Sequence, residues 1–589
     1  MSNFQSMKRF FILSALAFGA SGAVAQPKLD LKSDTWVATD ALGRTIAIAG
    51  EDGVPAPRSG KTVVMFYYIW HGFHSPVGPN DITKILAKDP TKPQWGPNGS
   101  FHWWGEPEAG YYRAEDPWVI RRNMSMLADA GVDAIFFDVT NAATYPDTVK
   151  AVCDTIRSMR AASDPAPQIG FVTHSHAAET QKKLWDDMYS KGTYSDLWFR
   201  WKGKPLILGE RDAKFGDGKE QSDEVKNFFT WRYSWAWKPG PGLWPWLDTS
   251  PQRPNPDPNA PDVNEETPVA TASHPTSFLG KSYSNGAQPA VDQYGLTPAT
   301  NEGRYFDQQW RGALQLDPEA VFVTQWNEWV AQRFTVDGES GPGFLGKPTK
   351  KGDSFFVDVY NAEFNRDIEP MKGGWNDNYY FQLVSNIRKY KGARPVETAS
   401  KPQTMKLGDF AAWKTVGPEY LDTRGDTLHR DFKGYAGDLR YQNTTGRNDI
   451  VSCKVARDKN NIYFYARTAD NLTAWNDPNW MQLFVDADQN AMTGWNGYDY
   501  AINTRLLNSK ETVVAKWNGT GWSAVGRARF LAANNALQIV VPRALLGMSG
   551  NETRFDFHWT DNASPKDLSD WMVSGDSAPN RRFNYRYNS

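Results

Sequence analysis

The sequence is poor in three features, and each shortage excludes a class of protein. Only two of the 589 residues are cysteines, Cys153 and Cys453, so no disulfide framework holds this fold together. Lysine and arginine total 65 against 67 aspartate and glutamate, a net charge of -2, which gives no electrostatic basis for binding nucleic acid. After the first apolar run near the N-terminus, no segment approaches the roughly 18 to 20 apolar residues of a membrane span. We therefore expect a chain with no membrane span and a neutral partner.

Several sequence motifs are missing as well. The chain has no G-x-G-x-x-G that opens a helix, no Walker motif and no G-x-S-x-G elbow. Dinucleotide binding, P-loop chemistry and serine-hydrolase chemistry are therefore not expected. The histidines lack a familiar metal-ligand spacing, so we expect no cofactor for catalysis.

The first residues have the pattern of a secretory signal. Two basic residues precede an apolar run over 10–18, and residues 23–25 read A-V-A, which is typical of a cleavage site. We predict a signal peptide over 1–25 and export to the periplasm or the medium. Residues 26–60 are then an N-terminal extension.

Residues 61–395 alternate short apolar segments with amphipathic ones, the pattern of a parallel α/β fold. The predicted strands are 62–70, 132–140, 169–176, 205–209, 229–237 and 320–327. The predicted helices are 116–130, 146–161 and 303–316. We therefore expect a (β/α)8 barrel as the catalytic domain.

Two long segments, 72–112 and 239–284, interrupt this alternation. Loops of that length inside a compact domain are usually functional when they are not disordered. Both are rich in tryptophan. We expect them to cover a site at the carboxyl ends of the strands, where barrel enzymes carry their chemistry.

The remaining sequence changes its period. Residues 396–406 are polar and contain proline, which predicts a linker. From 407 to 589 short alternating strands are separated by Asn, Gly and Asp, which predicts a separate antiparallel β-sandwich.

The segment FVTQWNEWVAQRF, residues 322–334, suggests the chemistry. A buried strand leads into Glu328, which stands between Trp326 and Trp329. Aromatic rings cover the apolar face of a sugar, and carboxylic acids cut glycosidic bonds. The alternative is that both tryptophans are core residues and Glu328 is a solvated loop acid.

Polar and aromatic residues recur where the predicted strands end. The carboxyl ends of parallel barrel strands share one mouth, so these residues are expected to meet there and bind substrate. They are Tyr68, Trp70, His71, Trp104, Glu106, Asn141, His174, His176, Arg232, Trp235, Trp326, Asn327 and Trp329.

Hydrolysis of a glycosidic bond generally uses two carboxyl groups. Glu328 is the first, and Asp138, at the end of a predicted buried strand, is the expected partner. The alternative for Asp138 is a cap on the next helix. Glu106 and Asp116, and then Asp248, are the next candidates, because loop acids are held less rigidly than an acid on a strand end.

The elements YYIWH, WWGEPEAGYY, AGVDAIFFDVTN, KGKPLIL and WNEW resemble those of the glycoside hydrolase family 99-like and family 71-like (β/α)8 barrels over residues 61–391. Family 99 enzymes carry two glutamates three residues apart, one acting as base on the 2-hydroxyl and the other as general acid. Glu328 matches the first of these, but Ala331 stands at the second position. The resemblance therefore implies a glycosidase whose second acid comes from elsewhere.

The region after residue 407 resembles family 9 carbohydrate-binding modules, through DFAAWKTVGPEYLDTRGDTLHRDF, LFVDAD and FHWTDN. Within it Asp486, Asp488 and Asn490 stand at alternate positions and resemble an oxygen-ligand calcium loop. A structural calcium ion is the expectation, and an Asp-rich turn is the alternative.

These features predict an exported, monomeric glycoside hydrolase that acts on a poly- or oligosaccharide with carboxylate catalysis. Two alternatives remain open. A non-catalytic glycan-binding protein on the same scaffold is favoured by Ala331. A polysaccharide lyase or esterase would need a Tyr/His/Arg or Ser/His set, and the sequence shows none.

Overall fold

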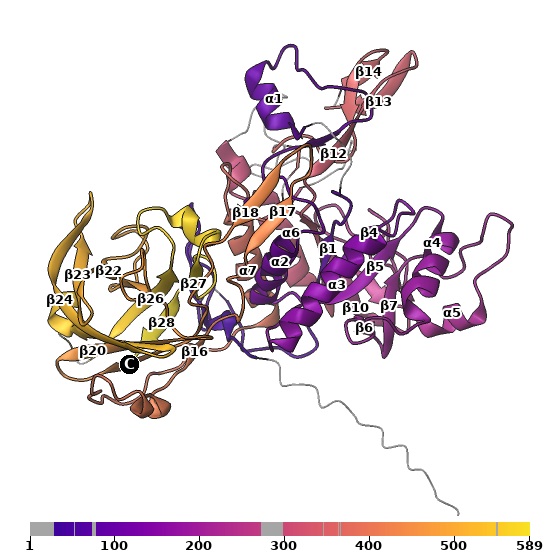
Figure 1. Ribbon diagram of the computed structural model, residues 1–589. Coiled ribbons are helices and arrows are strands. Elements are labelled where there is room, and N and C mark those ends of the chain that lie inside the picture. Colours follow the sequence, from indigo (N-terminus) through magenta and orange to yellow (C-terminus); the bar gives the residue numbers. More distant parts are fainter. Residues whose placement is uncertain are drawn as a thin grey trace, which may run out of the picture.

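A computed structural model describes residues 29–589 apart from 52, 73–77, 273–297, 346, 363, 366, 549 and 551. The predicted signal peptide lies outside the described residues. Figure 1 shows an α/β part in purple and an antiparallel sheet in yellow lying beside it. In the described part of the chain, no helix is both long and apolar enough to cross a membrane.

The α/β part is built on a sheet whose order is β6-β7-β5-β4-β1-β11-β10-β9, with β8 on the side of β7. Seven of these strands are parallel: β1 (Thr62–Tyr67), β4 (Ala134–Val139), β5 (Gln168–Thr173), β7 (Lys204–Leu208), β8 (Thr230–Arg232), β10 (Ala260–Val269) and β11 (Ala320–Trp326). Two short strands at the sheet edges are antiparallel to their neighbours: β6 (Arg200–Trp201) pairs with β7, and β9 (Asn255–Asp257) pairs with β10.

The parallel strands follow one another in the order expected of a barrel, but the ring is not closed by strand pairing. Within the described residues β8 and β10 do not pair, and only an isolated bridge between Tyr233 and Leu243 extends the sheet beyond β8. The observed architecture is therefore a mixed, mostly parallel sheet covered by helices.

The helices of this part are α1 (Ile82–Lys88), α2 (Pro117–Ala130), α3 (Pro146–Ala161), α4 (Ala177–Leu184), α5 (Asp223–Phe228), α6 (Arg304–Leu316) and α7 (Asn378–Lys391). The three helices predicted from the sequence are confirmed as α2, α3 and α6. The start and end of α2 follow from local chemistry: Asp116 caps its N-terminus, and Gly131, with φ 89°, ends it in the left-handed conformation.

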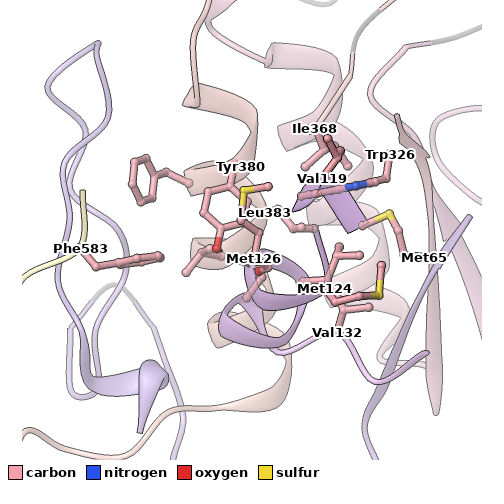
Figure 2. Close-up of a cluster of buried hydrophobic side chains, with 14 of the residues drawn as sticks. Met65, Val119, Met124, Met126, Val132, Trp326, Ile368, Tyr380, Leu383 and Phe583 are labelled. Atoms are coloured by element: carbon pink, nitrogen blue, oxygen red, sulfur yellow. Dashed lines mark hydrogen bonds between the residues drawn. The ribbon is translucent and has the colours of Figure 1, made fainter. Parts of the chain in front are cut away.

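Both faces of the parallel sheet are buried, so alternate residues of β1 pack in opposite directions. Val64 and Phe66 pack on one face, whereas Val63 and Met65 face the helices. Figure 2 shows Met65 meeting residues of α2 and α7, with Phe583 of the C-terminal part reaching the same cluster. The core of the α/β part therefore continues into the neighbouring sheet.

Both predicted loops contain secondary structure. The first holds β2 (Asn80–Asp81), α1 and β3 (Phe101–Trp103), and the second holds β9 and β10; its residues 273–284 lie outside the described residues. The prediction of one long loop was wrong for β10 because its segment lacks an apolar pattern, with the carboxylic acids Glu265 and Glu266 fully buried in it.

Two small sheets, antiparallel except for the parallel pairing of β2 with β3, lie above the main sheet in Figure 1. One has the order β15-β12-β3-β2 and includes β12 (Val330–Thr335) and β15 (Ser354–Phe356); the other pairs β13 (Ser340–Phe344) with β14 (Lys347–Lys350). Because β12 begins two residues after Glu328, pairing in this small sheet fixes the part of the chain that follows Glu328.

The C-terminal part is antiparallel, as predicted, but it is one sheet rather than the two sheets of a sandwich. Its order is β16-β19-β20-β25-β24-β23-β22-β21-β26-β27, with β28 also on β26. The strands are β16 (Tyr420–Leu421), β19 (Ile450–Arg457), β20 (Asn461–Thr468), β21 (Gln482–Asp486), β22 (Tyr500–Asn508), β23 (Glu511–Trp517), β24 (Trp522–Ala533), β25 (Ala536–Pro542), β26 (Arg554–Asp561), β27 (Asp576–Ala578) and β28 (Tyr585–Asn588). A separate hairpin pairs β17 (Arg430–Lys433) with β18 (Arg440–Asn443). The sheet curls, and the Ile450 N–H at one end donates to the Asp576 carboxylate at the other.

The N-terminal extension and a row of ion pairs join the two parts. Trp36 packs on Phe583, with ring centroids 5.4 Å apart, and its carbonyl accepts a hydrogen bond from Arg388 of α7. Arg581 binds Glu108 at 2.6 Å with only 6% of its side chain exposed. The seam is therefore both apolar and charged.

We predict that Arg581→Ala lowers the free energy of unfolding by about 3–5 kcal/mol, because it leaves the carboxylate of Glu108 short of a buried partner. Urea unfolding followed by tryptophan fluorescence measures the effect. Lys150→Ala, which breaks an exposed pair with Asp154, is the matched control and should leave the midpoint unchanged. Equal midpoints for the two variants would contradict the prediction.

Candidate active site

Three adjacent strands bring Tyr68, Asp138 and Glu328 together at their carboxyl ends. β1 lies between β4 and β11 in the sheet, and the three residues stand at or just after the ends of these strands. The hydroxyl of Tyr68 hydrogen bonds to the Glu328 carboxyl, and the charge of Asp138 acts on both groups. The strand order alone thus assembles the two acids and the phenol.

The backbone at Glu328 is held by a buried carboxylate. Asp367 accepts hydrogen bonds from the N–H groups of Asn327 at 2.8 Å, Glu328 at 2.7 Å and Glu369 at 2.8 Å. Asn327, with φ 62°, also exchanges two hydrogen bonds with the backbone of Tyr68. The turn that carries Glu328 is therefore tied to the neighbouring strand end.

Glu328 has an unusual environment for an acid. Burial, together with the charges of Asp358, Asp367 and Asp138, raises its pKa well above the ordinary value, while the hydrogen bond from Tyr68 opposes the rise. The residue as a whole is 9% exposed. The surroundings of this carboxyl therefore favour its protonated form more than water does.

Asp358 is a member of this group that sequence reasoning missed. Burial and the charge of Asp138 raise its pKa to about 6, although the residue is exposed to solvent. A group that is accessible yet surrounded by protein atoms is placed as a reacting group would be. Asp358 follows β15, a short strand outside the parallel sheet, so the strand-end rule gave no signal for it.

Asp138 does not cap the next helix. The Oδ1 of Asp138 accepts hydrogen bonds from the N–H of Thr140 at 3.0 Å and from the Thr140 hydroxyl at 2.7 Å. The next helix, α3, begins after Tyr145 without a side-chain cap. Burial raises the pKa of Asp138, and the two bonds from Thr140 oppose that rise. Its carboxylate is therefore fixed in orientation beside Glu328.

The other candidate acids are already engaged in ion pairs. Glu106 binds Lys84 at 2.6 Å and Lys372 at 2.9 Å, and Asp116 binds Arg430 at 2.7 Å while capping α2. Asp248 is a buried partner of Arg253. None of the three is among the charges that act on Glu328, so the ranking that placed Asp138 first is retained.

Five residues expected to contact substrate are buried instead, among them Asn327, whose side-chain amide is bonded to the backbone of Tyr68. Trp104, Trp326 and Trp329 have no exposed surface, and His71 is 1% exposed. Trp104 stacks on Trp329 with ring centroids 4.7 Å apart, and Figure 2 shows Trp326 in the cluster of α2 and α7. The expectation is corrected because an aromatic ring without exposed surface cannot cover a sugar.

Arg232 also has a structural place. It forms a double ion pair with Glu265, at 2.5 and 2.6 Å, and both side chains are buried. Glu265 further accepts a hydrogen bond from the indole of Trp201 at 2.7 Å. The expected role of Arg232 in substrate binding is therefore replaced by a role inside the sheet.

Partly exposed rings do remain near the strand ends. His174 stacks on Trp235, with centroids 3.5 Å apart and planes 23° apart, and Trp246 meets Trp235 edge-on at 5.0 Å. Trp70 is also partly exposed, while Asn141 and His176 are exposed. Burial and the charge of Lys238 lower the pKa of His174, so it is a neutral ring at pH 7.

The expected calcium loop brings together a slightly different set of residues. One carboxylate oxygen each from Asp486, Asp488 and Asp499 lie within 4.8 Å of one another. Asn490 closes the turn, since its Oδ1 accepts from the N–H of Met492 at 3.1 Å. Burial, the charge of Asp556, and the hydrogen bond and charge of Asp488 together raise the pKa of Asp486 to about 8. The all-oxygen donor set suits calcium.

No protein-family model and no curated protein matches this chain. Among solved structures, the GH99 endo-alpha-mannosidase from Bacteroides thetaiotaomicron is similar with a TM-score of 0.32 and 14% identity, covering 56% of this chain and 97% of that one. The same enzyme in complex with bis-tris-propane gives a TM-score of 0.31 and 12% identity over the same shares. TM-scores this low assign no function to this chain.

We predict that the carboxyl of Glu328 is protonated at pH 7, because burial and its acidic neighbours disfavour the charged form. Difference infrared spectroscopy should show a carboxylic acid C=O band in the wild type that Glu328→Gln removes. Glu106→Gln is the matched control, since the two lysines hold Glu106 ionised and no acid band should be lost. An unchanged acid band in Glu328→Gln would refute the assignment.

Proposed function

We propose that this protein is a glycoside hydrolase in which Glu328 and Asp138 are the catalytic carboxyl groups. The observation that carries the proposal is the meeting of Glu328, Asp138 and Tyr68 at the ends of β11, β4 and β1, with acids whose pKa values differ from the ordinary one. Two carboxyl groups in different environments are the equipment of a glycosidase. A poly- or oligosaccharide is the proposed substrate.

The two environments assign different roles. Glu328 has the more strongly raised pKa, so it would donate a proton to the oxygen that leaves the cleaved bond. Asp138, oriented by Thr140, would act as the ionised partner, either directing water or attacking the sugar carbon. Tyr68 would hold the Glu328 carboxyl in place between these events.

Partly exposed rings provide the surface for the sugar. Trp70, Trp235 and Trp246 offer faces of the kind that cover a pyranose ring, and the neutral His174 offers a hydrogen-bonding edge. Ala331 supports a partner acid from elsewhere, since it is buried in β12 opposite His102. An acid at that position would lie in the small sheet and not beside Glu328.

The same proposal extends to the whole chain. The seven parallel strands would belong to a (β/α)8 barrel over 61–395, joined by a linker at 396–406 to a module over 407–589 that resembles family 9 carbohydrate-binding modules. The signal peptide would direct export and would then be cleaved. The exported protein would be a monomer. Asp486, Asp488 and Asp499 would hold a structural calcium ion.

Glu328→Gln and Asp138→Asn should each reduce turnover on the order of 10² to 10⁴, because each removes a proton transfer or a charge at the reacting bond. Release of reducing ends from a panel of polysaccharides measures the effect, with Glu106→Gln as the control that should remain active. Glycan binding without any product from the wild type would favour a non-catalytic glycan-binding protein. An unsaturated uronate among the products would instead identify a lyase.

Asp358→Asn should move the alkaline limb of the pH-rate profile to lower pH. The negative charge of Asp358 raises the pKa of Glu328; removing that charge lets Glu328 lose its proton at lower pH, and activity that needs the protonated acid then falls earlier. Asp337→Asn, at an exposed residue before β13, makes the same change in net charge and should leave the limb in place. A limb that moves upward, or moves equally in both variants, would contradict the assignment.

A further inference from the structure

Four aspartates meet where the two ends of the curled sheet approach α2. Asp422 and Asp426 follow β16, Asp449 precedes β19, and Asp576 is the first residue of β27. One carboxylate oxygen each from Asp422, Asp426 and Asp576 lie within 4.8 Å of one another. The charge of Asp449, the residue before β19, also raises the pKa of both Asp422 and Asp576.

Several oxygens in this group have nothing to bind in the protein itself. Asp422 is fully buried, and among the described residues neither of its carboxylate oxygens has a hydrogen-bond partner. Among the described residues, one carboxylate oxygen of Asp426 and one of Asp449 are also buried without a hydrogen-bond partner. Burying ionised carboxylates without partners is strongly unfavourable, so the cluster must hold either protons or a positive ligand.

The nearby arginines supply only part of that charge, since the charges of Arg424 and Arg121 lower the pKa of Asp449. Arg121 is engaged with Asp164 at 2.9 Å, and the side chain of Arg424 forms no ion pair with the four aspartates in the described residues. The charge of Arg121 lowers the pKa of Asp426 but is not among the main causes acting on Asp422 or Asp576. Four carboxylates therefore face too few cations.

We propose that Asp422, Asp426 and Asp576 bind a divalent cation of the size of calcium, with the negative charge of Asp449 adding to the field at the site. All the donors are carboxylate oxygens, which calcium prefers, and the 4.8 Å limit on the separation of Asp422, Asp426 and Asp576 is about twice a calcium–oxygen distance of roughly 2.4 Å. This site is separate from the Asp486 loop, since it uses other residues on other strands.

The position of the site gives the ion a structural task. Asp576 already accepts from the N–H of Ile450 at 2.6 Å, so an ion there would add to the closure of the curled sheet. The loop that carries Asp422 and Asp426 also docks on the α/β part, because the N–H of Arg424 donates to Asp164 at 3.0 Å. The cation would therefore strengthen the seam between the two parts.

Calcium binding by the full-length protein tests the proposal. Chelator-treated wild type, Asp422→Asn and Asp488→Asn are dialysed against CaCl2 at pH 8, and bound calcium and melting temperature are measured. We expect Asp422→Asn to bind one ion fewer than the wild type and to lose part of the calcium-induced rise in melting temperature. Asp488→Asn, altered only in the other loop, should keep that part of the rise.

A further readout separates loss of a ligand from damage to the fold. In chelator, Asp422→Asn should melt no lower than the wild type, because the amide relieves repulsion among the carboxylates. If that variant does not fold, Asp426→Asn at a half-exposed ligand gives the same readout. Equal calcium content in the wild type and the ligand variant, or no calcium bound by the wild type, would overturn the proposal and identify the cluster as protonated acids.

Discussion

The Asp367 carboxylate is the constraint on which the proposed site depends. By accepting three backbone N–H groups, it holds a turn in which two non-glycine residues, Gln325 and Asn327, adopt φ 78° and 62°. Such a conformation costs on the order of 1–3 kcal/mol per residue and persists only where the surroundings enforce it. The result is that Glu328 leaves β11 directed toward Tyr68 and Asp138 instead of continuing the strand.

The electrostatics follow from that geometry. Glu328 and Asp138 are buried, Asp358 is exposed beside them, and the negative charges of Asp138 and Asp358 disfavour ionisation of Glu328. Like charges close together cannot all be ionised, which is how neighbouring carboxyl groups come to hold different numbers of protons. Trp104, Trp329 and Trp375 form a buried aromatic layer. The indole N–H of Trp104 donates to the carbonyl of Glu328 at 2.8 Å, so these tryptophans act as scaffold.

Much of the parallel region could be predicted from the sequence, because its strands are continuous apolar runs and its helices carry clear stop signals such as Gly131. β10 could not, since Glu265 pairs with Arg232 and Glu266 accepts from Asn255, and only the fold brings these partners near. Local periodicity also predicts antiparallel strands in the C-terminal part but not their number per sheet, which depends on long-range pairing such as that of β26 with β21. In the site, strand ends indicated Asp138 and Glu328, whereas Asp358 lies outside the regular strands. A tryptophan beside an acid does not reveal whether its ring faces the core.

The structure of Glu328→Gln with a bound oligosaccharide tests the central claim most directly. If Glu328 is the proton donor, the amide at position 328 should lie within about 2.6 to 3.2 Å of a glycosidic oxygen, with the carboxylate of Asp138 on the other side of the same bond. An oligosaccharide bound away from β11, or one that presents only hydroxyl groups to position 328, would contradict the account.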